Sequence, residues 1–221
     1  MTFTDAPKSP ITPGGRQPDV RSVFSFRNRG LLGGLLLVPA AVAVVFSHPT
    51  LAGNGFPALL LNAGGWIFFL LCAGVRVWAT LYVGGHKDRQ LETEGPYSLC
   101  RNPLYFGSLC FAISIACFLK SITFSGALLV AAFVYFHWVV RAEERYLELR
   151  FGEDFRSYCR RTPRFWPRRS AFQTGEQVEV DVKRLKNEIV RLGRAALIPI
   201  ILQTIAQLNT ASWWPHWFTL F

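Results

Sequence analysis

Residues 103–140 read PLYFGSLCFAISIACFLKSITFSGALLVAAFVYFHWVV, and Lys120 is the one charged residue in this stretch. An apolar helix needs about 20 residues to cross a hydrocarbon core of about 30 Å. The runs 103–119 and 122–140 on either side of Lys120 approach that length. Pro103 suits the first turn of a helix, because the amide hydrogen that proline lacks would be unpaired there anyway. The stretch therefore predicts a hairpin of two membrane-spanning helices.

The segments before this hairpin also have the composition of a membrane protein. In the whole chain 51% of residues are hydrophobic and 17% are charged, against about 25% charged in an ordinary globular domain. Residues 31–47 carry no charge and residues 57–84 carry only Arg76. We expect residues 31–84 to form a first helical hairpin. Residues 1–30, which are rich in Pro and Gly and lack an apolar period, are expected to form a disordered tail.

The hairpin is followed by a polar region and a C-terminal region. The second hairpin helix is expected to continue to about Arg150 and to end at Gly152, whereas residues 161–169 cannot be regular helix. Within the C-terminal region 171–221, apolar residues recur every three to four positions over 177–194, which predicts an amphipathic helix. Residues 195–208 are apolar but short for a span, so they either cross with a tilt or lie partly in the interface. The residues that follow resemble an interfacial aromatic belt: Trp213, Trp214 and Trp217.

Basic residues are distributed unevenly along the chain, which has a net charge of +10. The segments 1–30, 85–102 and 141–194 hold 22 of the 24 Lys and Arg residues. Loops with such an excess lie on the cytoplasmic side of a membrane. A basic soluble domain would suggest nucleic acid instead, but the apolar segments argue against that interpretation. We predict an all-α integral membrane protein with four to five transmembrane helices, placed in a cell membrane of the bacterial inner-membrane type, with a cytoplasmic C-terminal segment.

Arg76 and the metal-binding residue types need separate interpretations. Arg76 is costly if it faces lipid. It either extends to the cytoplasmic interface or contacts Glu143 or a ligand carboxylate inside the bundle.

The five cysteines and four histidines show no spacing of a metal site or of a disulfide framework, so we expect no metal site.

Three polar motifs lie on the predicted cytoplasmic side. They read GPYSLCRNPLYFG at 95–107, RAEERYL at 141–147 followed by Phe-Gly at 151–152, and RRTPRFWP at 160–167.

Each motif has a binding interpretation and a structural one. Asn102 and Pro103 start a helix whose free N–H groups suit an anionic acceptor, or they only cap a span. Glu143 and Glu144 lie where the second hairpin helix leaves the bilayer, and a carboxylate at that depth needs partners. They either accept hydrogen bonds from a ligand or pair with neighbouring arginines. Arg164 and the aromatic rings after it either bind an anion and an adjacent flat ring of a ligand, or anchor the chain at the membrane interface.

Taken in order, these motifs resemble the isoprenylcysteine carboxyl methyltransferase family, whose superfamily includes membrane phospholipid methyltransferases. The resemblance covers about residues 76–167 and makes 85–170 the methyltransferase core. It implies S-adenosylmethionine as the methyl donor and an active site at the cytoplasmic face. The residues expected to bind the cofactor are Leu91, Tyr97, Arg101, Asn102, Pro103, Tyr105, Glu143 and Arg164. Those expected to act in catalysis are Arg101, Asn102 and Glu144.

The chain departs from the family at Asn102, where the family pattern has histidine. Asparagine keeps a hydrogen-bond donor and an acceptor, but it is no base at neutral pH. The expected acceptor is an amphiphile, and its nucleophile stays open: a carboxylate, a phospholipid amine or a small thiol. A non-catalytic membrane protein of the same fold is the alternative. Membrane lipids are expected partners and nucleic acid is not. The sequence predicts no oligomeric state.

Overall fold

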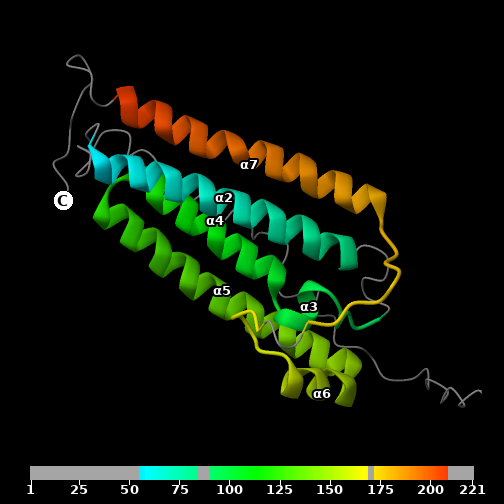
Figure 1. Ribbon diagram of the computed structural model, residues 1–221. Coiled ribbons are helices and arrows are strands. Elements are labelled where there is room, and N and C mark those ends of the chain that lie inside the picture. The colour runs from blue at the N-terminus through cyan, green and yellow to red at the C-terminus, as the bar shows by residue number, and fades with distance from the viewer. Residues whose placement is uncertain (1–54, 84–89, 169–171, 209–221) are drawn as a thin grey trace, which may run out of the picture. The chain divides into compact units, whose positions relative to one another are not determined.

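A computed structural model of the chain describes residues 55–83, 90–168 and 172–208. These ranges contain helices and no strand (Figure 1). The helices are α2 (Phe56–Val83), α3 (Pro96–Leu99), α4 (Pro103–Leu119), α5 (Ile122–Phe151), α6 (Glu153–Arg161) and α7 (Val182–Leu208). By length and composition α2, α5 and α7 can each cross a membrane, and α4 is a shorter apolar helix. The predicted all-α membrane class is therefore confirmed. The expected tail 1–30, the span at 31–47 and the Trp213–Trp217 belt lie outside the described residues.

The predicted hairpin is present with the expected boundaries. α4 ends at Leu119, and Lys120 turns the chain in the left-handed region with φ of 51°. Ser125 on α5 donates from its Oγ to the Ala116 carbonyl across the turn, at 2.8 Å. α5 then extends without a break to Phe151 and stops at Gly152, whose φ is 54°. Glycine adopts this conformation without the steric cost that a Cβ would bring.

The prediction for the C-terminal region was wrong in its details. A single helix, α7, replaces the expected pair of segments 177–194 and 195–208, and residues 177–181 are not helical. The Asp181 carboxylate accepts the Arg184 N–H at 3.1 Å and so satisfies a free donor of the first turn. Pro199 lies inside the helix and is buried, a position that bundled membrane helices tolerate. At 27 residues α7 is about 40 Å long, so the apolar half is not an isolated short span.

Small residues bring α2 and α4 close together. α4 lies between α2 and α5, and α7 runs beside α2 and α4 (Figure 1). A Cβ added to Gly65 of α2 would lie 2.6 Å from the Phe118 ring of α4. Ser114 of α4 donates from its Oγ to the Gly65 carbonyl at 2.8 Å. Close approach through small residues is the usual basis of helix association in a bilayer, where burial of apolar surface drives little.

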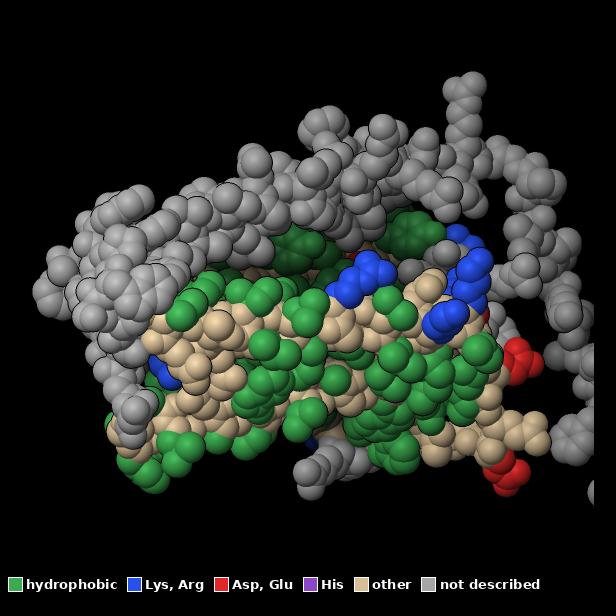
Figure 2. Space-filling model, turned by 90° about the horizontal axis from the view of Figure 1, so that it is seen from above, with side chains coloured by type: hydrophobic (Ala, Val, Ile, Leu, Met, Phe, Trp, Pro, Cys, Tyr) green, Lys and Arg blue, Asp and Glu red, His purple; other side chains and the backbone are tan. Residues whose placement is uncertain are grey.

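The charged side chains of the described face gather toward one end. In Figure 2 hydrophobic side chains cover much of the face, and most of the Lys, Arg, Asp and Glu side chains lie toward the end where α7 begins. In Figure 1 this is also the end where α2 finishes, α4 starts and α6 lies. The three motifs therefore share the polar end of the bundle.

A helix that the sequence analysis did not predict, α6, lies beside the end of α5. Glu153 and Asp154 occupy its first turn, and Arg160 and Arg161 occupy its last turn. Acidic residues at a helix N-terminus and basic residues at its C-terminus interact favourably with the helix dipole. α6 brings the start of the third motif back toward the end of α5.

Candidate functional site

All three motifs meet at the carboxylate of Glu144, which is 8% exposed. Arg101 donates from Nε to Glu144 Oε1 at 3.0 Å. Asn102 donates from Nδ2 to the same oxygen at 3.2 Å. Arg164 donates to Oε2 from Nε at 2.9 Å and pairs with it through Nη2 at 2.7 Å. One buried carboxylate of the second motif thus holds side chains from the first and third motifs.

The Arg101 side chain also fixes the end of α6. Its Nη1 donates to the carbonyls of Cys159 at 3.0 Å and Thr162 at 2.9 Å. A cation at a helix C-terminus satisfies carbonyls that have no partner within the helix. Two backbone hydrogen bonds run alongside, from the Arg101 N–H to the Pro163 carbonyl at 2.9 Å and from the Arg168 N–H to the Leu99 carbonyl at 3.0 Å. The first and third motifs are therefore joined by side chain and backbone together.

Asn102 stands at the predicted N-cap position of α4, but its side chain makes no capping hydrogen bond. Its Nδ2 group donates instead to Glu144 and to the Arg164 carbonyl, the latter at 3.1 Å. Both neighbours are acceptors, and this determines which end of the amide faces them. The position occupied by histidine in the family is thus used here for donation, which requires no basic nitrogen.

A second carboxylate lies beside Glu144 in the sequence but faces a different direction. Successive residues of a helix point about 100° apart. The Tyr105 hydroxyl of α4 donates to Glu143 Oε2 at 2.5 Å, and the Tyr105 ring packs edge-on against Phe136. Burial raises the pKa of the Tyr97 phenol well above its ordinary value, and the negative charge of Glu143 raises it further. Tyr97, Tyr105 and Glu143 therefore form a second polar group.

The remaining predicted residues lie around these two groups. Pro103 is buried at the first position of α4. Leu91 is half-buried in the non-helical segment 91–93, and its role in binding stays a prediction. Tyr158 of α6 lies between the second and third motifs, and its buried side chain was not predicted from the sequence. Its hydroxyl donates to the Tyr97 carbonyl at 2.7 Å. Burial raises the pKa of this phenol above its ordinary value.

A segment beyond the motifs covers the Gly95 turn. The Gly95 N–H donates to the Gln173 carbonyl at 2.7 Å, and the Gln173 N–H donates to Ser98 Oγ at 3.0 Å. Gly95 has φ of 55°, and the Tyr82 ring lies where a Cβ would be. Glycine is therefore required here both by conformation and by space. The sequence gives no sign of the segment around Gln173, because hydrogen bonds made by the backbone leave no residue motif.

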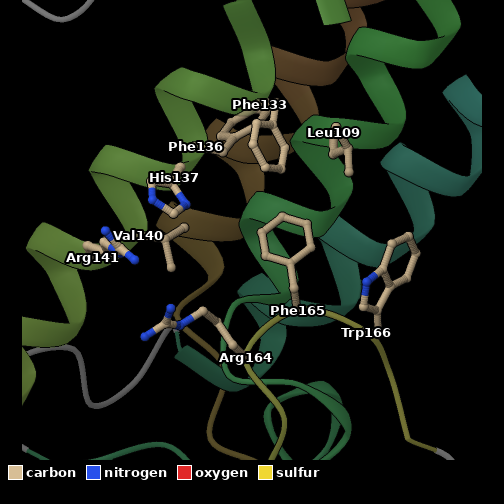
Figure 3. Close-up of a pocket in the computed structure, with 9 residues that line it drawn as sticks. All are labelled: Leu109, Phe133, Phe136, His137, Val140, Arg141, Arg164, Phe165 and Trp166. Carbon is tan, nitrogen blue, oxygen red and sulfur yellow. The ribbon is translucent and has the colours of Figure 1, made fainter. Parts of the chain in front are cut away.

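Two cavities adjoin the Glu144 cluster. An apolar groove of about 240 Å³ lies between α4, α5 and the third motif (Figure 3). Its walls are Leu109, Phe133, Phe136, His137, Val140, Arg141, Arg164, Phe165 and Trp166. A more open polar cavity of about 630 Å³ lies next to it. Its walls are Arg101, Arg141, Glu144, Arg145, Glu148, Phe155, Arg156, Cys159, Arg160 and Arg164. The two cavities share Arg141 and Arg164.

One of the two interpretations of Arg76 from the sequence, a contact with a carboxylate inside the bundle, is partly confirmed. Its guanidinium does contact a carboxylate inside the bundle, but the partner is Glu188 of α7 at 2.6 Å and not Glu143. Glu188 was not predicted as a partner, because it lies in the segment 177–194, which the sequence predicts as an amphipathic helix. In the described ranges, no three His, Cys, Asp or Glu side chains lie together in a way that could hold a metal ion.

Comparison with known proteins gives one family and two relatives. Residues 54–154 match the sequence model of the phospholipid methyltransferase family. The cobalt-zinc-cadmium resistance protein CzcN of Cupriavidus metallidurans is 34% identical over 189 residues, which are 85% of this chain and 85% of that protein. The nickel-cobalt-cadmium resistance protein NccN of Alcaligenes xylosoxydans xylosoxydans is 28% identical over 214 residues, 95% of this chain and 98% of that protein. No solved structure matches the chain.

Proposed function

Because the chain belongs to the phospholipid methyltransferase family of membrane proteins, we propose that it transfers a methyl group from S-adenosylmethionine to an amphiphilic acceptor. The site would lie at the cytoplasmic face of the membrane. The observation that carries the proposal is the meeting of three motif segments at Glu144, next to one apolar and one polar cavity. A transferase for an amphiphile needs this combination, since the donor is polar and the acceptor is largely apolar.

The residues at the polar end fit the proposed donor. S-adenosylmethionine carries a carboxylate, an ammonium group, ribose hydroxyls and a flat adenine ring, so its site needs both signs of charge. Glu143 and Tyr105, which line neither cavity, offer acceptors for an ammonium or hydroxyl group beside them, and Arg164 is half-exposed and lines both cavities. The polar cavity has the size of common small-molecule sites. When bound, the donor supplies a methyl group that its sulfonium already activates.

Glu144 then has an organising role. Its two oxygens accept hydrogen bonds from Arg101, Asn102 and Arg164, so they are engaged before any substrate arrives. We assign Glu144 to holding these three side chains in place rather than to accepting a proton. Fixed geometry of this kind accelerates a transfer reaction by aligning the reacting groups in advance.

The apolar groove is the proposed site for the acceptor's hydrocarbon part. Phe133 and Trp166 at its edge are 69% and 74% exposed, which fits a groove that opens toward lipid. Arg141 and Arg164 belong to both cavities, so a molecule in the groove would place its polar head at the polar cavity. A carboxylate acceptor needs no proton acceptor, whereas an amine or a thiol does.

Donor binding tests the proposal, with Glu143→Gln as the variant. Loss of one charge-assisted hydrogen bond costs about 1.5–3 kcal/mol, or roughly tenfold to a hundredfold in affinity. Calorimetric titration of S-adenosylmethionine should show this loss. Glu176→Gln is the matched control, because Glu176 is exposed and lines neither cavity. Normal binding by folded Glu143→Gln would exclude the glutamate from the site. Absence of binding by the wild-type protein would favour the non-catalytic alternative.

The acceptor can be identified with labelled donor. The purified protein is incubated with S-adenosylmethionine carrying a labelled methyl group and with a membrane lipid extract, and the labelled product is then analysed. A lipid product would support the amphiphilic acceptor. Label found only in water-soluble thiols would contradict it.

The relatives suggest a second candidate, a role in metal resistance, because both are named for it. Growth of a metal-sensitive host on cadmium, cobalt or zinc salts can be compared for the wild-type chain and Glu143→Gln. If methyl transfer underlies resistance, the variant loses both activities. Resistance that survives the loss of donor binding would separate the two functions.

A further inference from the structure

A buried ion pair outside the three motifs joins α7 to the rest of the bundle. Arg76 of α2 donates from Nε to Glu188 Oε1 of α7 at 2.6 Å. Glu188 is 6% exposed, and its other oxygen accepts from Arg191 Nη1 at 2.9 Å. The family match ends at residue 154, so the family relationship assigns nothing to Glu188. A charge this deep in an apolar bundle persists only with partners, which makes Arg76 and Glu188 a fixed unit.

The same guanidinium also reaches the first turn of α4. Arg76 donates from Nη1 to Ser108 Oγ at 2.7 Å and to the Leu104 carbonyl at 3.2 Å. Ser108 Oγ donates in turn to that carbonyl at 3.0 Å. A guanidinium is planar and presents its donors in fixed directions. Anchoring Nε on Glu188 therefore determines where Nη1 meets α4.

We propose that Glu188 is a positioning residue of the methyl-transfer site. It orients Arg76, and Arg76 holds the first turn of α4, from which Asn102 and Tyr105 reach Glu144 and Glu143. The inference rests on the proposed function, since it assigns the support of that same site. α7 then belongs to the working unit of the protein, because a small displacement of positioned groups is enough to slow a transfer reaction.

Arg76→Lys separates positioning from folding. Lysine keeps the positive charge beside Glu188 but offers a single nitrogen in place of the separate Nε and Nη1 donors. The variant should keep an unfolding temperature near that of the wild type, whereas its affinity for S-adenosylmethionine should fall by about threefold to thirtyfold. Arg184→Gln is the matched control. It removes the partly exposed pair with Asp181 on α7, and its donor affinity should equal that of the wild type.

A double substitution, Arg76→Met with Glu188→Met, removes both buried charges at once. Replacement of a buried ion pair by apolar residues is often neutral for stability, so this variant should fold. If the pair only held α7 in the bundle, the double variant would bind the donor like the wild type, and the inference would be overturned. A folded double variant with affinity as low as that of Arg76→Lys supports positioning.

Hydrogen exchange gives a readout that needs no donor. In Arg76→Lys, the amides of residues 106–109 on α4 should exchange faster than in the wild type, because they donate to the carbonyls of the start of α4, which has lost its anchor. The same amides should be unchanged in Arg184→Gln. Equal exchange in wild type and Arg76→Lys would refute the inference even if the wild type binds S-adenosylmethionine. Failure of the wild type to bind the donor would instead refute the proposed function.

Discussion

At the scale of single residues, Asn102 shows how a site can keep its geometry after losing a titratable side chain. Its amide donates to the Glu144 carboxylate and to the Arg164 carbonyl. A histidine would need both ring nitrogens protonated to make two such donations, whereas asparagine makes them at any pH. The departure from the family pattern is thus compatible with the same arrangement of Arg101, Glu144 and Arg164.

Asn102→Ala should weaken donor binding less than Glu143→Gln does. The lost hydrogen bonds come from a neutral amide, and one of them goes to a carbonyl. Both hydrogen bonds hold protein groups in place and act on the donor only indirectly, so a loss of roughly twofold to tenfold in affinity is expected. Titration calorimetry of the two variants side by side measures the difference. A larger loss for Asn102→Ala would mean that the amide contacts the donor directly.

Tyr158 should make stability depend on alkaline pH. Burial raises the pKa of its phenol above the ordinary value of 10.0, so the folded state holds this proton more tightly than the unfolded state. The resulting stabilisation is complete below about pH 10 and is lost as pH rises from there toward the folded pKa. The unfolding temperature measured in detergent should therefore fall above about pH 10. Tyr158→Phe should be less stable at neutral pH, since it leaves the Tyr97 carbonyl without this donor, but its alkaline slope should be smaller. An equal slope would assign the effect to other groups.

The motifs singled out residues that lie together in the structure, but not how these residues pair, and their roles in binding and catalysis stay predictions. Arg101, Asn102, Glu144 and Arg164 were all identified, because the motifs name them, and the structure places them in one cluster. Their pairing could not be predicted, because it depends on α6, which returns the third motif to α5. Glu188 could not be assigned for a different reason. A glutamate in a basic amphipathic stretch looks like part of a solvated face until a packed neighbour is known.

At the scale of helices, the sequence correctly predicted those boundaries that are set by turn-forming residues or by the length of an apolar run. Lys120 and Gly152 end their helices where the sequence placed the ends. The start of α7 was predicted too early. The apolar periodicity runs from Val178 to Val182 without a break, so it does not reveal that Asp181 caps the helix. A local capping carboxylate, rather than the apolar pattern, determines that boundary.

Gly107 of α4 makes the contact between α2 and α4 possible. A Cβ at this position would lie 2.6 Å from Arg76 Cγ and 3.4 Å from the Cys72 carbonyl oxygen. Gly107→Ala should therefore destabilise the protein by about 1–3 kcal/mol, the usual cost of overpacking, despite alanine's higher helix propensity. Gly126→Ala on α5 is the control, because nothing lies within 4 Å of its added Cβ. Thermal unfolding in detergent compares them. If both variants were as stable as the wild type, the close approach at Gly107 would not matter.

At the scale of the whole molecule, the bundle separates an apolar body from a charged end. The polar cavity, α6 and the first turns of α7 all carry arginines, and the turn at Lys120 lies at the opposite end of α4. The segments 1–30, 85–102 and 141–194 hold 22 of the 24 basic residues. Such loops are retained on the cytoplasmic side during insertion. The asymmetry from which the orientation is predicted thus also supplies the charges of the candidate site.

We predict that this charged end faces the cytoplasm, and labelling of introduced cysteines tests the prediction. The five native cysteines are first replaced, and Lys120→Cys, Arg150→Cys and Lys183→Cys are then made one at a time. α4 and α5 form an antiparallel hairpin, so Lys120 and Arg150 lie near opposite ends of α5, and Lys183 stands in the first turn of α7. In intact cells, a membrane-impermeant thiol reagent should label Lys120→Cys, whereas the other two variants should react only after permeabilisation. Labelling of Arg150→Cys and Lys183→Cys in intact cells would place the site outside the cytoplasm, where S-adenosylmethionine is not supplied, and would contradict both the orientation and the proposed donor.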